Sequence, residues 1–242
     1  MPPFGADWAF FLDIDGTLLD IEHRPEAVHV EPRELELVAA LHRAAGGALA
    51  LISGRPLAGI DVLFHPLKLP IAGQHGAERR DSRGARHRYR FPVKVLQRAA
   101  APVREFVAAN PGLIFEDKGA SVALHYRLAP QLAPEAEAVV RDAAESAAGA
   151  LQMQRGKMVF ELKPAGCDKG TAIEEFMQDE VFAGRTPVFL GDDITDEFGF
   201  RVVNRLNGYS VKVGEGPTVA RWRLAGPAEA RSWLADWLRT CV

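Results

Sequence analysis

Two acidic segments in this chain each follow a short apolar run, and this pattern most constrains the fold. Residues 10–18 read FFLDIDGTL, and residues 188–197 read VFLGDDITDE. Short, uninterrupted apolar runs of this kind are typical of strands buried in a parallel sheet. Parallel strands end at a common edge, where open α/β sheets bind their ligands. We therefore expect the two acidic segments to meet at that edge.

Carboxylates that converge in this way need cations beside them. If Asp13, Asp15 and Asp192 lie close together, their mutual repulsion raises their pKa values. Mg2+ and the ammonium of Lys169 would balance these charges, and Mg2+ is held by a few hard oxygen ligands that leave room for water and phosphate. The sequence has no cluster of Cys and His residues that would indicate a softer metal. The pattern predicts a magnesium-dependent phosphoryl-transfer site.

Composition excludes several other classes of protein. The 242 residues are 48% hydrophobic and 25% charged, which is typical of a globular chain, and we expect two domains. The net charge of −3 lacks the basic excess that binds nucleic acid or anionic membranes. Cys167 and Cys241 are too few for a disulfide framework, and no apolar run approaches a membrane span. We expect a cytoplasmic monomer with neither of these partners.

Strand and helix patterns alternate at both ends of the chain, which predicts an α/β fold with a Rossmann-like parallel sheet. The expected elements are strand 8–12, helix 34–44, strands 48–52 and 70–72, helix 169–178, strand 187–190, helix 195–204, strand 210–213 and helix 228–238.

The middle of the chain has a different pattern. Tight turns join strand-like pairs, 113–116 with 121–127 and 151–154 with 158–163, and helical patterns fill 93–109 and 134–149. This order predicts an inserted α+β cap with an antiparallel sheet, at residues 79–164, between core segments 1–78 and 165–242. We interpret the arginine-rich stretch 79–90 as a solvated hairpin, because beyond Tyr89 and Phe91 it offers no interleaved aromatic residues that could stack on bases.

Several residues suit particular steps of phosphoryl transfer. Asp13 fits a nucleophile that forms an aspartyl phosphate, and Asp15 fits an acid and base that serves the leaving alcohol and then water. Lys169 follows the N-cap residue Asp168, and a cation in the first turn of a helix indicates an anion nearby. Ser53 also fits a helix N-cap, but beside these motifs we expect its hydroxyl to bind phosphate.

Together these segments resemble the four motifs of the haloacid dehalogenase (HAD) superfamily of phosphohydrolases: DIDGT at 13–17, Ser53, Lys169 and GDDITDE at 191–197. The resemblance implies that Asp13 is the nucleophile. It also implies that Asp15 is the acid and base and binds Mg2+ through its main-chain carbonyl, and that Asp192 is a metal ligand. The residues that would support this metal shell are Asp193 and Asp196.

Segments of the middle region carry a narrower resemblance. GQHG at 73–76, EDK at 116–118, HYR at 125–127 and GKMVFE at 156–161 are similar to the trehalose-6-phosphate phosphatase family, whose cap is of the C2B type. Each charged residue among them also fits a surface ion pair, and His75 also fits a packed core histidine. The predicted substrate-binding residues are Thr17, Arg55, Gln74, His75, Glu116, Lys118, Arg127, Lys157 and Glu161.

The resemblance implies hydrolysis of trehalose 6-phosphate to trehalose and phosphate through an aspartyl-phosphate intermediate, with Mg2+ as cofactor. Alternatives are another sugar-phosphate phosphatase or a hexose-phosphate mutase of the same superfamily, or a sugar-phosphate sensor without catalytic activity. Association with a trehalose-phosphate synthase cannot be read from the sequence.

Overall fold

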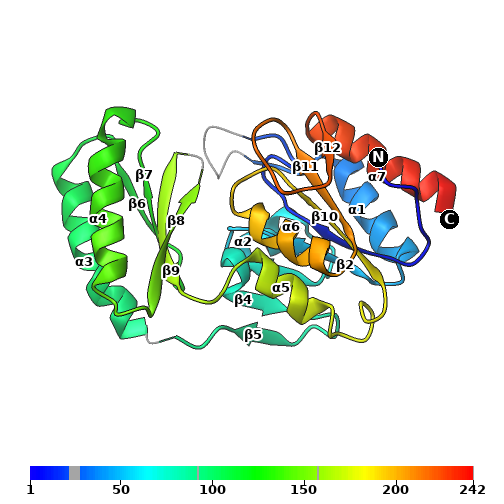
Figure 1. The fold of residues 1–242 in the computed structure, drawn as a ribbon, viewed down its shortest axis with the longest axis horizontal. Coiled ribbons are helices and arrows are strands. Elements are labelled where there is room, and N and C mark those ends of the chain that lie inside the picture. The colour runs from blue at the N-terminus through cyan, green and yellow to red at the C-terminus, as the bar shows by residue number, and fades with distance from the viewer. Residues whose placement is uncertain (22–27, 92, 157, 242) are drawn as a thin grey trace. The chain divides into compact units, whose positions relative to one another are not determined.

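The computed structural model describes residues 1–21, 28–91, 93–156 and 158–241. The chain forms two compact units (Figure 1). One consists of Met1–Arg88 and Asp168–Val242, and the other of Tyr89–Cys167. We call them the core unit and the inserted unit and describe each by itself.

The core unit is built on one sheet. Within the described residues its strand order is β12-β11-β10-β1-β2-β3-β4-β5, parallel from β12 to β3 and antiparallel at β4 and β5. The strands are β1 (Trp8–Leu12), β2 (Leu49–Ile52), β3 (Ile71–Gly73), β4 (Glu78–Arg80), β5 (Arg86–Arg88), β10 (Thr186–Gly191), β11 (Tyr209–Val213) and β12 (Trp222–Leu224).

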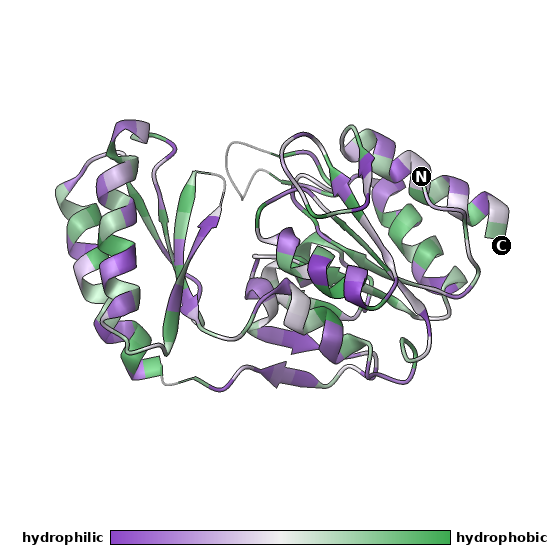
Figure 2. Ribbon diagram, viewed as in Figure 1, coloured by the Kyte–Doolittle hydropathy of each residue, from purple (hydrophilic) through white to green (hydrophobic). Residues whose placement is uncertain are grey.

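Helices cover both faces of this sheet because β1 is apolar on both sides. Phe10 packs on Trp237, with ring centroids 4.8 Å apart, and Phe11 packs on Phe176 at 6.1 Å. Neighbouring strand residues point to opposite faces, so α7 (Pro227–Cys241) and α5 (Lys169–Phe176) lie on opposite faces. Helix α1 (Pro32–Ala44) packs beside α7, and α6 (Asp196–Arg205) packs beside α5 (Figure 1). Figure 2 shows the central strands as the hydrophobic layer.

The arginine-rich hairpin is part of the core sheet and not of the inserted unit. Strand β4 pairs with β3, so the units divide at Arg88 and Cys167 and not at residues 78 and 164. The solvated interpretation holds for residues 83–90, which are exposed, but not for Arg79 and Arg80, which are buried. Arg79 donates from Nε to Glu175 of α5 at 2.9 Å. Arg80 bonds both carboxylate oxygens of Asp61, because α2 (Leu57–Leu63) lies beside β4.

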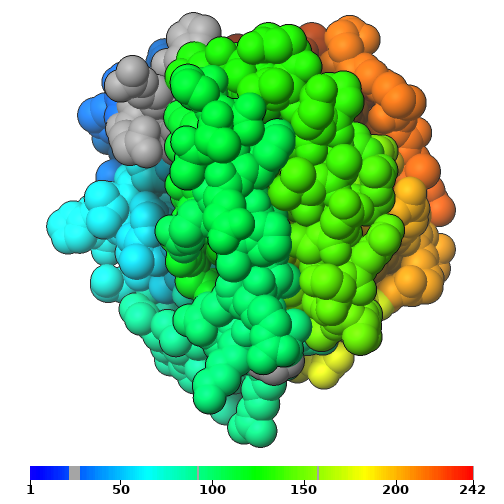
Figure 3. All heavy atoms as spheres, turned by 90° about the vertical axis from the view of Figure 1, so that its left-hand side faces the viewer, coloured from blue at the N-terminus to red at the C-terminus, as the bar shows by residue number. Residues whose placement is uncertain are grey.

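The inserted unit is an α+β layer. Its antiparallel sheet has the order β6-β7-β9-β8, and α3 (Val93–Ala109) and α4 (Ala133–Glu145) pack side by side on one face, which Figure 3 shows. The strands are β6 (Ile114–Asp117), β7 (Val122–His125), β8 (Leu151–Gly156) and β9 (Val159–Pro164). Two short 3-10 helices cover Gln74–Gly76 in the core unit and Pro130–Leu132 in the inserted unit.

The predicted α/β fold class is confirmed. Among the described residues, sequence reasoning missed α2, β12 and the two 3-10 helices. Among the described helices, none is both long and apolar enough to cross a lipid bilayer.

Replacing Arg80 with Ala should lower the free energy of unfolding by about 2–4 kcal/mol, because the change leaves Asp61 and the carbonyl of Leu69 without their buried cationic donor. The matched control is Arg86→Ala in the same hairpin, since the Arg86 side chain is 68% exposed and 3.8 Å from Asp61. Urea unfolding of both variants measures the difference. Equal changes in the free energy of unfolding for the two variants would contradict a stabilising effect of the buried Arg80 contacts.

Candidate active site

The two acidic segments meet at the carboxyl edge of the core sheet, as expected. Strands β1 and β10 are parallel neighbours, with Leu12 opposite Leu190, and the amide of Asp13 donates to the carbonyl of Leu190 at 3.0 Å. Carboxylate oxygens of Asp13, Asp192 and Asp196 all lie within 4.8 Å of one another. The register of two strands therefore brings together acids that lie almost 180 residues apart in the sequence.

Lys169 lies between these acids. Helix α5 begins at Asp168, whose carboxylate accepts from the amide of Thr171 at 2.9 Å, and Lys169 is the first residue of the helix. Its Nζ donates to Asp13 and to Asp196, each at 2.7 Å, and its side chain is 3% exposed. The predicted anion near this lysine is thus a pair of carboxylates from two other segments.

The charges of the cluster shift the pKa values of its members. Burial lowers the pKa of Lys169, but the charges of Asp13 and Asp196 outweigh burial and raise it, so the ammonium stays protonated. Burial raises the pKa of Asp13 well above its ordinary value; Lys169 opposes that rise, and Asp196 and Asp192 add to it. Burial and the charge of Asp196 raise the pKa of Asp192 to about 6. The cluster therefore contains three carboxyl groups but one ammonium group among the described residues.

Asp196 organises the loop between β10 and α6. Besides Lys169, its carboxylate accepts from the amides of Asp192 at 3.0 Å and Asp193 at 2.9 Å. Gly191 leaves space for it, because a Cβ at Gly191 would lie 2.3 Å from the carboxyl carbon of Asp196. The hydrogen bonds of the Asp196 carboxylate fix the backbone conformation at Asp192.

Gly16 leaves space for Asp192 in the same way. Its φ is +87°, and a Cβ at this position would lie 2.1 Å from Oδ2 of Asp192. The turn after β1 also brings Thr17 back to Asp13, to which the Thr17 hydroxyl donates at 3.2 Å. The Gly-Thr pair of the motif therefore lets the two acidic segments approach each other.

The cluster fits a hard divalent cation. Oδ1 of Asp192 is buried and, among the described residues, has no hydrogen-bond partner, although buried carboxylate oxygens usually have one. Asp13, Asp192 and Asp196 offer only oxygen ligands, which Mg2+ prefers. The surplus of negative charge and the unpaired oxygen together favour a cation beside Asp192.

Asp15 and Ser53 lie on the neighbouring turns of this edge. Both oxygens of the Asp15 carboxylate accept from Arg55, Oδ2 from Nε and Oδ1 from Nη2, each at 2.7 Å. The side chain of Asp15 is 34% exposed, whereas Ser53 is buried. The Ser53 Oγ accepts from the amide of Arg55 at 3.1 Å, which leaves its hydroxyl hydrogen to donate elsewhere.

Gln74 and His75 are both buried in the turn after β3, where their φ values are positive. The Gln74 side-chain amide donates to Glu78, and a Cβ at Gly54 would lie 2.7 Å from Nε2 of His75. Their predicted contacts with substrate remain predictions.

Two of the charged residues predicted to bind substrate from the inserted unit, Glu116 and Glu161, share one face of its sheet. Glu116, Ala123 and Glu161 lie opposite one another on β6, β7 and β9, whereas their sequence neighbours, including Leu124, pack under the helices. Glu161 accepts from the Ser121 hydroxyl at 2.5 Å.

Two further pairs complete this polar face. Lys118 lies 3.7 Å from Glu161, and His125 lies 2.8 Å from Glu116. The hydrogen bond from His125 outweighs burial and lowers the pKa of Glu116, so this carboxylate stays ionised. Arg127 follows β7 on a turn, and Lys157 lies outside the described residues.

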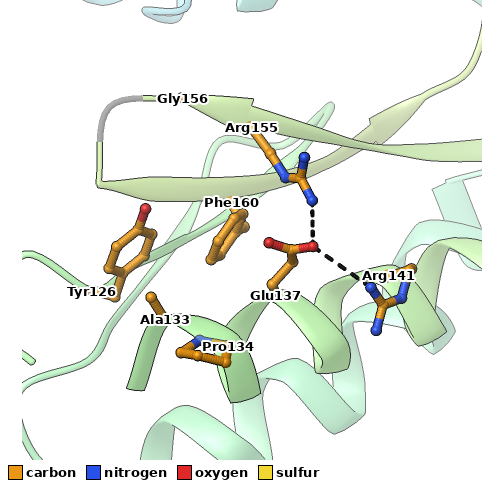
Figure 4. Close-up of a pocket in the computed structure, with 8 residues that line it drawn as sticks. All are labelled: Tyr126, Ala133, Pro134, Glu137, Arg141, Arg155, Gly156 and Phe160. Atoms are coloured by element: carbon orange, nitrogen blue, oxygen red, sulfur yellow. Dashed lines mark hydrogen bonds and ion pairs between the residues drawn. The ribbon is translucent and has the colours of Figure 1, made fainter. Parts of the chain in front are cut away.

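A cavity of about 490 Å3 lies on the other side of this sheet (Figure 4). Tyr126 and Phe160 stack at its wall, with centroids 4.8 Å apart, and Glu137 of α4 pairs with Arg155 of β8 across it. The cavity opens along the helix-covered face, and none of the predicted sugar-binding residues that the structure describes lines it.

Sequence reasoning missed Lys212. This lysine is buried in β11, and its ammonium donates to the main-chain carbonyl of Asp192. The available signal was a single charged residue in the otherwise uncharged strand 209–213.

Comparison with known proteins agrees with this geometry. The profile of the trehalose-phosphatase family matches residues 11–228. The chain belongs to the trehalose-phosphatase family. It is 46% identical to the trehalose-6-phosphate phosphatase of Escherichia coli K12, over 96% of this chain and 87% of that one.

Solved structures show the same fold. A trehalose-6-phosphate phosphatase related protein superposes with a TM-score of 0.78 at 29% identity, over 95% of this chain and 96% of that one. A phosphatase of the haloalkanoate (HAD) superfamily from Bacteroides thetaiotaomicron superposes with a TM-score of 0.63 over 98% of both chains. At 16% identity the second likeness concerns the fold alone. This trehalose-phosphatase family member therefore shares its fold with that phosphatase.

Gly16→Ala should weaken Mg2+ binding by more than about tenfold, because the new Cβ must displace the Asp192 carboxylate. Gly84→Ala is the control: its φ is +84° but no atom lies within 4 Å, so it carries only the backbone strain of about 1–2 kcal/mol. Calorimetric titration with Mg2+ measures the affinities. Equal affinities for the two variants would contradict the steric argument.

Asp192→Asn should stabilise the metal-free protein near neutral pH. The raised pKa means that folded Asp192 keeps its proton between a pH of about 4 and about 6 while the unfolded chain releases it, so stability falls as pH rises through that window. The Asn variant should regain on the order of 3 kcal/mol above that window. Thermal unfolding in EDTA across this range tests the effect, with the exposed Asp20→Asn as control. A pH dependence of stability that is the same in Asp192→Asn as in the unchanged protein would contradict the raised pKa of Asp192.

Proposed function

We propose that this chain is a Mg2+-dependent phosphatase that hydrolyses trehalose 6-phosphate to trehalose and phosphate. The observation that carries the proposal is the buried Lys169 ammonium, which bridges Asp13 and Asp196 beside Asp192. This arrangement gives a carboxylate of fixed orientation at the sheet edge where α/β folds bind ligands. Membership of the trehalose-phosphatase family supports the choice of substrate.

In the proposed reaction, Asp13 attacks phosphorus in line with the ester oxygen. The bond from phosphorus to the sugar oxygen breaks as the aspartyl phosphate forms, and Asp15 donates a proton to the departing alcohol. Asp15 then accepts a proton from a water molecule that attacks phosphorus, which releases phosphate and restores Asp13. The two carboxylates divide the displacement into two steps of lower barrier.

Three groups would hold the cation: the carboxylates of Asp13 and Asp192 and the main-chain carbonyl of Asp15. When bound, Mg2+ would offset the repulsion between these acids and the phosphate and stabilise charge on the transferring phosphoryl group. Asp193 and Asp196 would support the loop that carries Asp192, as the hydrogen bonds of Asp196 to that loop indicate.

Hydroxyl and ammonium groups would bind the phosphate oxygens. Lys169 already holds Asp13 at 2.7 Å, so its positive charge lies beside the atom that attacks. Ser53 has a hydroxyl hydrogen left to donate, and Thr17 orients the second oxygen of Asp13. Together they would place the phosphorus near the nucleophile and stabilise developing charge.

The sugar would be recognised by the polar face of the inserted unit. Glu116 and Glu161 suit adjacent hydroxyl groups, because one carboxylate can accept from two of them. Lys118 and Arg127 would add cationic donors. Lys157 and the buried Gln74 and His75 stay predictions of the family resemblance.

Phosphate release from a panel of sugar phosphates tests the proposal. The panel contains trehalose 6-phosphate, sucrose 6-phosphate, glucose 6-phosphate and mannose 6-phosphate, each with Mg2+ and with EDTA. We expect strong preference for trehalose 6-phosphate that EDTA abolishes. Equal turnover of all four compounds would contradict trehalose 6-phosphate as the specific substrate. An isomerised hexose phosphate would indicate a mutase. Binding without phosphate release would indicate a sensor.

Glu161→Gln should lower kcat/KM for trehalose 6-phosphate by about 10- to 100-fold, because the amide replaces one of the two acceptor oxygens of the carboxylate with an NH2 donor. Turnover of a small aryl phosphate should be nearly unchanged. The matched control is Glu137→Gln, which removes a carboxylate on the helix-covered side of the same sheet. Equal losses on both substrates would contradict a role of Glu161 in sugar binding.

A further inference from the structure

Arg55 was expected to bind substrate, but its side chain contacts the proposed acid and base. Nε and Nη2 of Arg55 each lie 2.7 Å from one oxygen of Asp15. This is a two-point, charge-assisted contact, which fixes the plane of a carboxylate as well as its position. One donor at each oxygen leaves the other lone pair of each oxygen available.

The backbone of Arg55 is itself firmly held. Its amide donates to the hydroxyl of Ser53 at 3.1 Å, and its carbonyl accepts from the amide of Gln74 at 2.9 Å. A Cβ at Gly73 would lie 2.9 Å from that carbonyl, so the two turns pack closely. The side chain of Arg55 therefore extends from a backbone that is held in place at the end of β2, and this side chain is 18% exposed.

Asp15 lacks comparable support on its own strand. It lies on the turn after β1, and its carboxylate is 34% exposed. The following residue, Gly16, has the conformational freedom that a positive φ requires. Without a partner, the side chain of Asp15 would sample several rotamers.

We propose that Arg55 is a positioning residue for Asp15. It holds the carboxyl plane so that the proton of the Asp15 carboxyl group, on a lone pair that the guanidinium does not use, faces the leaving oxygen. After that proton is donated, the same lone pair accepts a proton from the attacking water. This inference rests on the proposed function, and it assigns Arg55 a role that it performs through Asp15 and not through the substrate.

The test uses two substrates that differ in their need for a proton. The alcohol of trehalose 6-phosphate is a poor leaving group that needs general-acid help, whereas dinitrophenolate leaves without a proton. First-turnover release of each leaving group isolates the step that forms the aspartyl phosphate from the later hydrolysis. The variants are Arg55→Met, Asp15→Asn and the double variant, with Arg55→Ala for rescue by added guanidinium and the exposed Arg83→Ala as control.

Arg55→Met should slow the first turnover of trehalose 6-phosphate by about 10- to 100-fold, which is part of the roughly 100- to 10,000-fold that general-acid catalysis contributes. It should slow that of dinitrophenyl phosphate by less than about 3-fold. The double variant should be no slower than Asp15→Asn alone, because both changes remove the same proton transfer. Guanidinium ion added to Arg55→Ala should restore part of the lost rate on the sugar phosphate only.

Equal losses on both substrates, or losses that multiply in the double variant, would overturn the inference and return Arg55 to phosphate binding. Absence of turnover in the unchanged enzyme would instead overturn the proposed function, so the two failures are distinguishable.

Discussion

The bridge from the Lys169 ammonium to Asp13 and Asp196 is the interaction on which the rest of the site depends. It joins the end of β1, the start of α5 and the start of α6, which are distant in sequence. All three side chains are buried, so removing Lys169 would leave Asp13 and Asp196 inside the protein without their shared cation. The orientation of the proposed nucleophile is therefore tied to the stability of the core unit.

The surplus of acid that remains after this bridge explains the preference for a cation. One ammonium cannot balance the carboxylates of Asp13, Asp192 and Asp196, and an oxygen of Asp192 stays unpaired. Glycines at positions 16 and 191 let these carboxylates approach despite their repulsion. The repulsion within this acidic cluster thus destabilises the metal-free protein, and a bound divalent cation would reduce that repulsion.

Local patterns in the sequence predicted much of the fold and of the candidate site. The contacts that these patterns missed are pairings between residues that are distant in the sequence. Asp13 and Lys169 were predictable because each follows a strand or cap signal within a few residues. The contact of Arg55 with Asp15 and that of Lys212 with the Asp192 carbonyl join separate strands, and no local periodicity encodes them. The burial of Arg79 and Arg80 was missed because their partners lie on α5 and α2, whose packing against β4 is a tertiary effect.

Chemical trapping of the intermediate tests the central claim most directly. Turnover of trehalose 6-phosphate with Mg2+ is quenched with borohydride, which reduces an aspartyl phosphate to homoserine, and peptide mass spectrometry then locates the reduced residue. The account predicts homoserine at position 13 only when substrate is present, and none in Asp13→Asn. Reduction at another aspartate, or none during active turnover, would contradict Asp13 as the nucleophile.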